Sequence, residues 1–579
     1  MKKYLILFGI LFFSFQAWAT DYYVTQSGAG SNDGKSLANA WAVSDFNSST
    51  NWATSEDADK IDPGDTVYFS GTLTSTIYPP DGYGGTSGNY ITLDGWQGGT
   101  CNPVANHEAL SFGSDNGVDK NACPSAAIID LDSITDSAIY LYGNDYITIQ
   151  DFQIRDAKYG VIEWDSGGST GITVRRNYIH DLYNKAIHNV LGTTNNSYWT
   201  IGGASGDGNF IYNCSEENRT EGSTSQTVNL SGNNIILSYN EIAFDFVNVK
   251  SHNVVEMHQC TDFLVEYNDL SYPSDDAAIS IKEDGDGNKR GVVRFNKLHH
   301  CAIGISISGS SYINEDLYIY GNFIYNLSDG FSGFRAYKQY DDIYFWSNIV
   351  SLVDSRGASV WYQSPDSQGD VYVYNNTIYK SGQDTVEGDS DRAGFYTDSG
   401  SANLSLNLVN NIFSHCDASE YRAYYNADVP DARINAWGDN LLYYPSQSIT
   451  IYWKGDNYTL SQFQAATSWG DGTTEEDPAF TDPDGGDNTD GTADDNFTLT
   501  QDSPAIGTAT DLGGTNEWSV TVQGVTYYMG PALGLDPNSD WTTTPPTASV
   551  LSRDVYGWSK GAYVFLGQQP AAIEGLVLE

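Results

Sequence analysis

The clearest pattern in the sequence is a short apolar run, then an asparagine, then a second short apolar run, repeated through the middle of the chain. Successive examples read NNIILSYNEI, DFLVEYNDLS, GVVRFNKLHH, LYIYGNFIYN, DIYFWSNIVS and DVYVYNNTIY. Their asparagines recur at intervals of 26 or 28 residues and are Asn240, Asn268, Asn296, Asn322, Asn348 and Asn376. The pattern extends back through Asn209 and Asn177 to Asp151, and forward to Asn411. A period in the twenties predicts a solenoid, in which each repeat buries its apolar face against the next.

Each repeat contains three short β runs, such as LYIYG, FIY and GFSGF, and little helix signal. Strands stacked between repeats are buried on one face, so Val, Ile, Leu and Phe take the inward positions. Asparagine tolerates the left-handed backbone of a tight turn, and its amide stacks on the asparagine of the next coil. This arrangement resembles the right-handed parallel β-helix, so we expect an all-β, single-stranded solenoid of about 10–12 coils. A β-propeller fits less well, because its blades need longer repeats and hairpin turns.

The pattern divides the chain into four parts. Residues 1–19 have the basic start, apolar run and small-residue end of a signal peptide, and we expect a bacterial protein that is secreted or periplasmic. Residues 20–125 form an N-terminal cap and the first coils with a loop excursion, and a short helix near residues 38–46 is expected to cover the open end. Residues 126–445 form the solenoid core, and residues 446–579 form a looser closing segment. No later apolar run is long enough to span a membrane.

Both ends of the chain resemble a family of secreted β-helix proteins. The matching stretches are DYYVTQSGAGSNDG, PGDTVYF and YITL near the start, and DPAF, SPAIG and SRDVYGWSKGAY near the end. The resemblance implies packing and turn roles for the closing segment. It implies a carbohydrate-active protein, most often a polysaccharide lyase, with a glycosidase, an epimerase or a non-catalytic carbohydrate-binding surface protein as alternatives. Lys250-Ser251 matches the Lys-Ser motif of the alginate lyase and chondroitinase B family, but no Arg-His-Gly motif follows.

The net charge of −47 excludes nucleic acid as the expected partner. A polyanionic substrate must therefore meet a locally basic patch or a bound cation. We expect a monomer whose partner is a polysaccharide. Cys101 and Cys123 bracket one polar loop and are the candidate disulfide. The remaining cysteines, expected as buried thiols, are Cys214, Cys260, Cys301 and Cys416.

One strand of each coil is expected to form an exposed strip, which we call the ribbon. Its predicted segments are residues 138–143, 160–165, 186–192, 226–232, 253–260, 277–283, 302–309, 330–338, 358–363 and 394–400. Alternation directs Val255 and Met257 inward, and Glu256 and His258 outward. A strand at residues 246–251 is the alternative register. The other outward residues expected on the ribbon are Lys282, Arg335, His188, Asn229, Trp361, Gln363, Tyr396 and Asp398.

A polysaccharide lyase needs a base beside a uronate carboxylate and a cation that neutralises that carboxylate. We assign Lys282 as the base, Arg335 as the clamp and His258 as an accessory acid or base beside Glu256. The expected substrate-binding residues are His188, Asn229, Trp361, Gln363, Tyr396 and Asp398. A solvated surface lysine is the alternative for Lys282. A hydrolase would instead pair Glu256 with Glu163 or Asp398. Long turns at residues 215–225 and 381–392 are expected to wall the groove.

A calcium site is predicted next to these residues. The run Asp284-Gly-Asp286-Gly-Asn288 carries oxygen ligands at alternate positions, as calcium loops do, and Glu283 precedes it. The acidic run 482–495 offers a second candidate for Ca²⁺. An ordinary solvated acidic turn is the alternative in both places.

Overall fold

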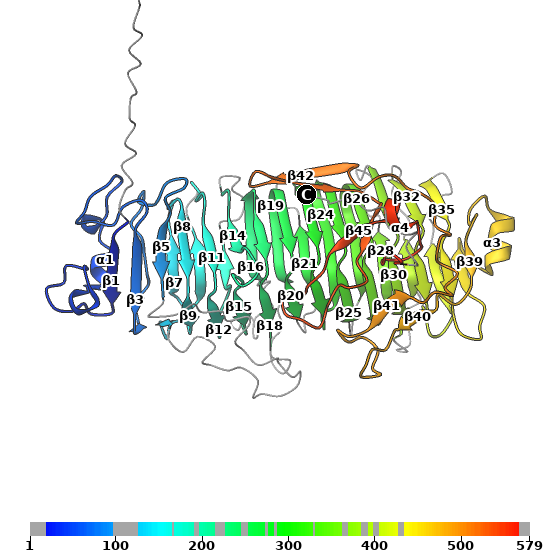
Figure 1. Cartoon of the computed structure of the whole chain (residues 1–579), viewed down its shortest axis with the longest axis horizontal. Helices are drawn as coiled ribbons and strands as arrows, with labels where there is room; N and C mark the ends of the chain where they lie inside the picture. The colour runs from blue at the N-terminus through cyan, green and yellow to red at the C-terminus, as the bar shows by residue number, and fades with distance from the viewer. Residues whose placement is uncertain are drawn as a thin grey trace, which may run out of the picture.

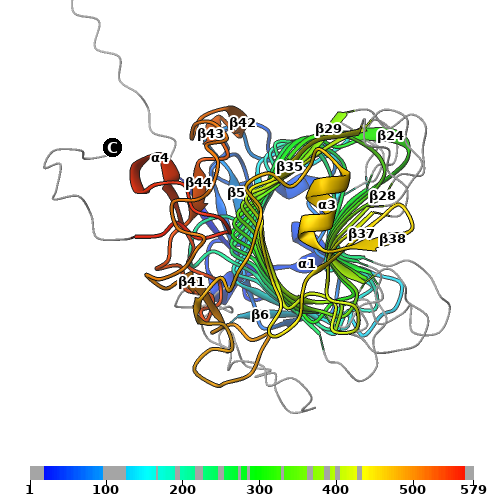
Figure 2. The ribbon, with the colours of Figure 1, turned by 90° about the vertical axis from the view of Figure 1, so that its right-hand side faces the viewer.

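The computed structural model is a parallel β-solenoid whose coils stack side by side along one long axis (Figure 1). Viewed along that axis, the coils superpose into a common cross-section, and the C-terminal segment lies outside it (Figure 2). The structure describes residues 19–95, 126–164, 167–189, 196–214, 226–244, 253–271, 276–282, 287–327, 331–361, 369–383, 392–397, 404–426 and 433–566.

The predicted ribbon is one continuous parallel sheet. Its strands are β7 (Ser137–Leu141), β10 (Tyr159–Glu163), β13 (Ile187–His188), β16 (Gln226–Asn233), β19 (Asn253–Glu266), β21 (Ala277–Lys282), β24 (Ile303–Tyr320), β26 (Ser332–Trp346), β28 (Arg356–Trp361), β31 (Ala393–Thr397), β34 (Arg422–Asn426) and β37 (Thr450–Trp453). Each predicted ribbon segment overlaps one of these strands, and neighbours pair in chain order. The ribbon prediction is therefore confirmed.

Two further rows of parallel strands complete each coil. The second row consists of β1 (Asp21–Thr25), β3 (Thr66–Ser70), β5 (Ile91–Asp94), β8 (Ile147–Gln150), β11 (Thr173–Arg175), β14 (Thr200–Gly202), β17 (Ile236–Ser238), β22 (Lys289–Arg294), β29 (Gly369–Tyr374), β32 (Leu404–Val409), β35 (Ile434–Gly438) and the later halves of β19, β24 and β26. The third row consists of β4 (Thr72–Leu73), β6 (Ala127–Asp130), β9 (Phe152–Arg155), β12 (Tyr178–His180), β15 (Phe210–Tyr212), β18 (Glu241–Ala243), β20 (Asp269–Ser271), β23 (Lys297–His299), β25 (Phe323–Leu327), β27 (Ile349–Val353), β30 (Thr377–Ser381), β33 (Ile412–Ser414), β36 (Leu441–Tyr443) and β39 (Thr474–Glu475). Three strands per coil are what the repeat predicts.

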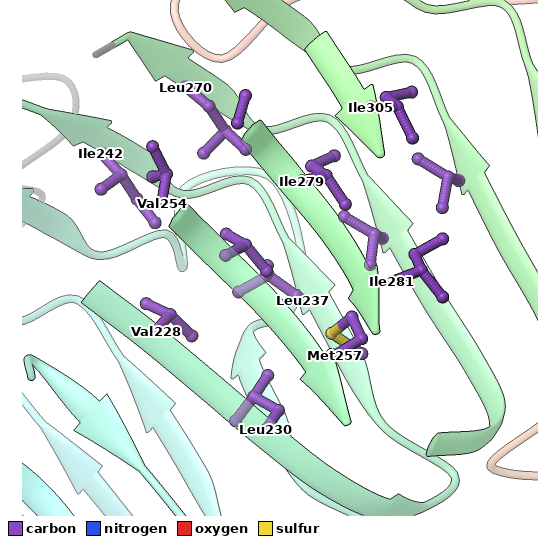
Figure 3. Packing of buried hydrophobic residues seen from close by; sticks show 14 of the residues in the cluster. Val228, Leu230, Leu237, Ile242, Val254, Met257, Leu270, Ile279, Ile281 and Ile305 are labelled. Atoms are coloured by element: carbon purple, nitrogen blue, oxygen red, sulfur yellow. The ribbon is translucent and has the colours of Figure 1, made fainter. Parts of the chain in front are cut away.

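The inward side chains of the ribbon fill the solenoid interior. Figure 3 shows Val228 and Leu230 of β16, Met257 of β19, and Ile279 and Ile281 of β21 pointing into one apolar core over three successive coils. All five are fully buried. Since Val255 lies opposite Val228 on one side and Ile279 on the other, the first of the two predicted registers is confirmed. Residues 246–251, the alternative strand, lie outside the described residues.

An asparagine ladder runs along the corner between the second and third rows. Each amide Nδ2 donates to the Oδ1 of the next member at 2.9 to 3.1 Å, through Asn177, Asn209, Asn240, Asn268, Asn296, Asn322, Asn348, Asn376, Asn411 and Asn440. One backbone detail differs from the prediction. The left-handed residue is the one before the asparagine, as at Tyr239 (φ 61°), Tyr267 (φ 54°) and Asp151 (φ 61°). Asp151 therefore precedes the ladder, and Phe152 occupies the ladder position, where its N–H donates to Asn177.

Replacing Asn296 by alanine is expected to destabilise the fold by about 1–3 kcal/mol, toward the upper end of that range, because several buried groups lose their partners together. The Asn296 amide donates to the carbonyls of Val265 and Arg294 and accepts from Asn268. Denaturant unfolding measures the change, with Asn457→Ala, at an exposed position, as the control. Equal unfolding midpoints for the two variants would remove the ladder's stabilising role.

Helical elements close both ends of the solenoid. At the N-terminal end lie η1 (Leu37–Asn39), α1 (Val43–Phe46) and η2 (Ser49–Asn51), which cover the region predicted as a capping helix. At the other end lies α3 (Leu460–Ala466) (Figure 2). Its Phe463 packs against Trp437 and Trp453, with ring centroids 4.8 and 5.3 Å apart. No helix in the described ranges is long and apolar enough to cross a membrane. Cys214, Cys260, Cys301 and Cys416 are buried free thiols, as predicted, and Cys101 and Cys123 lie outside the described residues.

After α3 the chain turns back and runs along the outside of the solenoid (Figures 1 and 2). Its elements are β40 (Phe480–Asp482), β41 (Asn496–Leu499), β42 (Trp518–Val522), β43 (Val525–Met529), β44 (Leu533–Leu535), β45 (Val550–Ser552) and α4 (Arg553–Tyr556). Trp518 packs on Tyr344 with ring centroids 4.3 Å apart, and the backbone N–H of Gln523 donates to Asn234 Oδ1 at 2.9 Å. The segment therefore covers outward aromatic rings of the second row.

The closing segment has a packing role, as its resemblance implies. Arg553 is fully buried, and its guanidinium donates to the carbonyls of Ser559, Gly561 and Ala562 at 2.7 to 2.9 Å. Burial lowers the pKa of Arg553 to about 9. A guanidinium bonded to backbone carbonyls holds the terminal turn in shape, and it lies away from the ribbon.

Candidate functional site

A polar pocket opens on the ribbon across five consecutive coils, from β16 to β26. It encloses about 340 Å³, open mouth included, and is lined by Gln226, Asn253, Glu256, Asp276, Ser280, Lys282, Ser306, Ser308 and Arg335. Three of the residues predicted for catalysis, Glu256, Lys282 and Arg335, therefore face one hollow. His258, the fourth, contacts Glu256 from the adjacent outward position.

The strand register explains why this hollow exists. In one outward row, Glu256 lies opposite Ser280, then Ser306, then Arg335. In the next row, His258 lies opposite Lys282, then Ser308. Coils are spaced by about 4.8 Å, so each step along a row moves one strand. Small serines separate the larger charged side chains, and the space above these serines forms the pocket.

Glu256 is a buried carboxylate held by three side chains. It accepts hydrogen bonds from Asn253 Nδ2 at 2.7 Å and Asn229 Nδ2 at 3.3 Å, and it bonds the Nε2 of His258. Burial on its own would raise the pKa of Glu256. The bonds from His258 and Asn253, with the charges of His258 and Lys282, outweigh burial and lower it. Glu256 is therefore ionised at neutral pH.

Arg335 is fixed at the opposite end of the pocket. Its Nη2 donates to Ser306 Oγ at 3.0 Å and lies 3.5 Å from Asp276 Oδ1. Its guanidinium lies over the Tyr337 ring, 5.6 Å from the centroid. Burial lowers the pKa of Arg335 and the Asp276 carboxylate opposes that shift. An arginine guanidinium stays charged and presents a rigid fork of donors, which suits carboxylate recognition.

Lys282 contrasts with both of these residues. It ends β21, is exposed, and its Nζ has no hydrogen bond or ion pair with any described residue. The amine is therefore available to an incoming ligand. Its positive charge acts on Glu256 across the pocket.

Strand alternation predicted the direction of the remaining ribbon residues but not their exposure. His188, Asn229 and Tyr396 point outward, in register with the pocket row, yet they are only 5%, 0% and 4% exposed. Adjacent outward side chains cover them, as Tyr425 stacks on Tyr396 at 5.2 Å. Trp361 is partly exposed. Residues 363 and 398, and most of the predicted walls 215–225 and 381–392, lie outside the described residues.

The hydrolase pairing of Glu256 with Glu163 is wrong. Glu163 is fully buried, lies opposite Leu141, and accepts from Gly143 N–H and Ser169 Oγ. It therefore points away from the pocket, and β10 is three strands from β19, about 14 Å. The second carboxylate in the pocket is Asp276.

Sequence reasoning missed Gln226, Asn253, Asp276 and Lys185. The first three line the pocket from the starts of strands, where alternation does not fix direction. Lys185 precedes β13, which is the ribbon strand next to β16 on the N-terminal side of the pocket. Burial lowers the pKa of Lys185, and Glu256 opposes the shift. Gln226 and Asn253 pair directly on neighbouring strands, so a polar residue at the start of successive ribbon strands is the signal that could have found these two.

Replacing His188 by glutamine is expected to reduce the acid sensitivity of the fold. Burial lowers the pKa of His188 to about 3, with Lys185 and His258 acting in the same direction. In the unfolded chain the histidine has an ordinary pKa of about 6.5. Between about pH 6.5 and about pH 3 the side chain is therefore protonated when the chain is unfolded and neutral when it is folded. The free energy of unfolding consequently falls as the pH drops through this range. At pH 5 the loss from this one residue is about 2 kcal/mol.

The measurement is the melting temperature of wild type and His188→Gln at pH 7.5 and pH 5. The gap between the two pH values should narrow in the variant. An equal gap would mean that His188 is protonated in the native state. Lys60→Ala, at the N-terminal end of the solenoid, serves as an unrelated control.

Of the residues predicted to bind calcium, the structure describes Asn288. Residues 283, 284 and 286 lie outside the described residues. Asn288 is fully buried in a second short ladder, where its Oδ1 accepts the Cys260 N–H at 2.8 Å and its Nδ2 donates to Asn314 at 2.8 Å. In the acidic run 482–495, Asp490 bonds Lys380 and Asp495 accepts the Gly491 N–H. Within the described ranges, no group of three or more His, Cys, Asp or Glu side chains is arranged to hold a metal ion.

We expect removal of calcium by a chelator to lower the melting temperature, because a ligand bound only by the native state stabilises it by mass action. The loss is about 2.7 kcal/mol when free calcium had been at one hundred times its dissociation constant. Restoring calcium, but not magnesium, should restore the melting temperature. An unchanged melting temperature at several pH values would leave residues 283–288 as an acidic turn.

Comparisons with known proteins concern the fold. No protein-family model matches the chain, and no curated protein matches its sequence. Solved structures that it resembles include XylC in complex with xylose, at 13% identity over 81% of this chain and 88% of that chain, with a TM-score of 0.37. A mannuronic acid-specific polysaccharide family 6 lyase from human gut microbiota has 12% identity over 79% and 91%, with a TM-score of 0.40. PfbA, a surface adhesin of Streptococcus pneumoniae, has 11% identity over 57% and 89%, with a TM-score of 0.32. At these identities the comparisons assign no activity.

Proposed function

We propose that the protein is a polysaccharide lyase that cleaves a uronate-containing chain by β-elimination in the ribbon pocket. The observation that carries the proposal is that a fixed guanidinium, Arg335, and an amine without a partner among the described residues, Lys282, line one hollow. Lyase chemistry needs a base and a cation, and these two groups can supply them, because the proton beside a carboxylate is removed when that carboxylate is neutralised.

In the proposed reaction, the uronate carboxylate binds the Arg335 guanidinium. The Lys282 amine, after releasing one proton to solvent, takes the proton from the ring carbon that carries the carboxylate. The electrons of that C–H bond form a carbon–carbon double bond, and the glycosidic C–O bond on the neighbouring carbon breaks. The leaving oxygen takes a proton from solvent at the open mouth of the pocket, because one ring nitrogen of His258 bonds Glu256 and the other is buried. The products are a new chain end and an unsaturated uronate end, and no water is consumed.

The charge distribution supports an acidic substrate. With a net charge of −47, most of the surface repels a polyanion. Lys282 and Arg335 give the pocket a local positive pole, and Lys185 adds a further cationic side chain beside Glu256. Binding should therefore concentrate at this part of the ribbon and weaken as ionic strength rises.

The test is incubation with alginate, pectate, chondroitin and neutral glycans, followed both by ultraviolet absorbance of unsaturated uronate and by reducing ends. Unsaturated product from an acidic glycan supports the proposal. Reducing ends without unsaturation would establish hydrolysis instead. No product from any glycan would leave a carbohydrate-binding or surface protein.

Glycoside hydrolysis is the second candidate, because Glu256 and Asp276 both line the pocket. Hydrolysis requires one carboxyl group to be protonated and to donate to the leaving oxygen. The pKa of Glu256 is lowered, so this carboxyl group favours the ionised form, and Asp276 lies 3.5 Å from the Arg335 guanidinium. This electrostatic setting favours the lyase over the hydrolase.

A further inference from the structure

An exposed tryptophan lies on the ribbon on the N-terminal side of the pocket. Trp164, directly after β10, is 52% exposed. Its ring is edge-on to His188, with centroids 6.1 Å apart, and lies 6.4 Å from Tyr159. His188 is in register with Asn229, and Asn229 is in register with Glu256. The aromatic group therefore adjoins the pocket along the same face.

A second aromatic group lies on the C-terminal side. Tyr337 and Trp361 occupy paired positions on β26 and β28, with ring centroids 5.8 Å apart. Both are partly exposed. Arg356 lies over the Trp361 ring at 4.9 Å, and Arg335 lies over Tyr337. The surface formed by Tyr337 and Trp361 therefore adjoins the pocket at its Arg335 end.

Buried polar atoms without partners lie between and beside these groups. They are His188 Nδ1, Asn229 Oδ1, His258 Nδ1 and Trp361 Nε1, none of which has a hydrogen-bond partner in the structure of the described residues. Buried polar atoms are nearly always paired, so each exception calls for an explanation. These atoms lie beneath the ribbon surface, so they mark where polar groups gather under the aromatic rings but do not themselves contact a bound sugar.

These observations lie on one line parallel to the solenoid axis. From β10 to β28 the ribbon advances seven strand spacings, about 34 Å. One spacing is close to the length of one pyranose in an extended chain. We infer that the bound polysaccharide runs along the ribbon from Trp164 to Trp361, stacks a sugar ring at each end, and is cleaved at an internal linkage over the pocket. This inference rests on the proposed function and adds the path of the chain and the internal position of the cut.

Binding is tested in the Lys282→Ala background, where the substrate is not consumed. Short and long oligosaccharides of alginate, pectate and chondroitin are titrated against that protein and against its Trp164→Ala, Trp361→Ala and Tyr528→Ala derivatives. Tyr528 is 60% exposed on β43 and controls for the loss of an exposed ring away from the ribbon. Each tryptophan variant should weaken binding of a long oligosaccharide by about five- to tenfold, and Tyr528→Ala should not change it. Trp361→Phe, which keeps a ring without the indole N–H, guards against misfolding of Trp361→Ala.

The position of the cut is tested with wild-type protein on the intact polysaccharide. Internal cleavage lowers viscosity early and releases a range of product lengths from the start. Release of one short product from the first time points would overturn the inference while leaving the lyase proposal standing. Unchanged binding in both tryptophan variants would overturn the path. Binding that depends on both tryptophans, with no turnover of any glycan, would support the path of the polysaccharide along the ribbon and remove the lyase proposal. Absence of all binding would remove both the path and the lyase proposal.

Discussion

Replacing Lys282 by alanine is expected to lower turnover of the acidic polysaccharide by about 10²- to 10⁴-fold and to leave the fold and most of the binding intact. Lys282 is exposed and makes no hydrogen bond or ion pair with the described residues, so its loss should change stability by no more than about 0.5 kcal/mol. A positioned base contributes about 10²- to 10⁴-fold to the rate, and this contribution is made in the transition state. We therefore expect kcat to fall by that factor with little change in KM.

The controls are the melting temperature of Lys282→Ala and the activity of Lys60→Ala, which removes a lysine at the N-terminal end of the solenoid. Wild-type turnover in Lys282→Ala would move the base elsewhere. Lys185, whose pKa is lowered by burial, and His188, which stays neutral through burial, are then the next residues to replace. Lys250, the remaining candidate from the sequence, lies outside the described residues.

Replacing Arg335 by alanine is expected to weaken both binding and turnover, which distinguishes it from Lys282. The guanidinium bonds the substrate carboxylate before and during proton removal, and loss of a charged hydrogen bond costs about 1.5–3 kcal/mol, roughly ten- to hundredfold, in each. The change also leaves Asp276 without the partner it has at 3.5 Å, so a carboxylate then repels the substrate. The measurement is KM together with the dissociation constant of an oligosaccharide in the Lys282→Ala background.

Arg335→Lys is the matched variant. It keeps the positive charge and loses the planar fork, so it should recover part of the binding and less of the turnover. Removing Asp276 as well, in Arg335→Ala with Asp276→Asn, should restore some binding because the repulsion disappears. Unchanged KM and kcat in Arg335→Ala would remove the clamp from the mechanism.

The repeat pattern predicted the fold because a solenoid is built from local rules. The spacing of Asn240, Asn268 and Asn296 predicts one ladder, and the apolar alternation around Val255 predicts the ribbon register. The predicted position of the left-handed residue was wrong by one. Asparagine tolerates a left-handed backbone, but this tolerance does not show whether the asparagine or its neighbour adopts that conformation. Here Tyr239 and Tyr267 adopt it, with positive φ, and the ladder asparagines do not.

The site was predictable only where strand alternation sets the direction of the side chain. Glu256, Lys282 and Arg335 are outward by alternation, and the coil spacing brings them together. Asp276 and Gln226 begin strands, where turn geometry sets direction, so the pattern is silent about them. Exposure was not predictable either. Whether an outward side chain such as Asn229 is covered depends on the sizes and contacts of its neighbours, which alternation does not contain.

The returning C-terminal segment has a consequence for how the chain completes its folding. Coils of a solenoid contact only their neighbours, so a solenoid can form progressively from one end. Here Gln523 bonds Trp199 and Asn234, residues 324 and 289 positions earlier, and Trp518 covers Tyr344. Closing such long loops is slow, and the outward tyrosines stay uncovered until the end of the chain has been made. Chains that end before Trp518 should therefore form the coils and then associate through these rings, so that the last segment made decides whether the protein stays monodisperse.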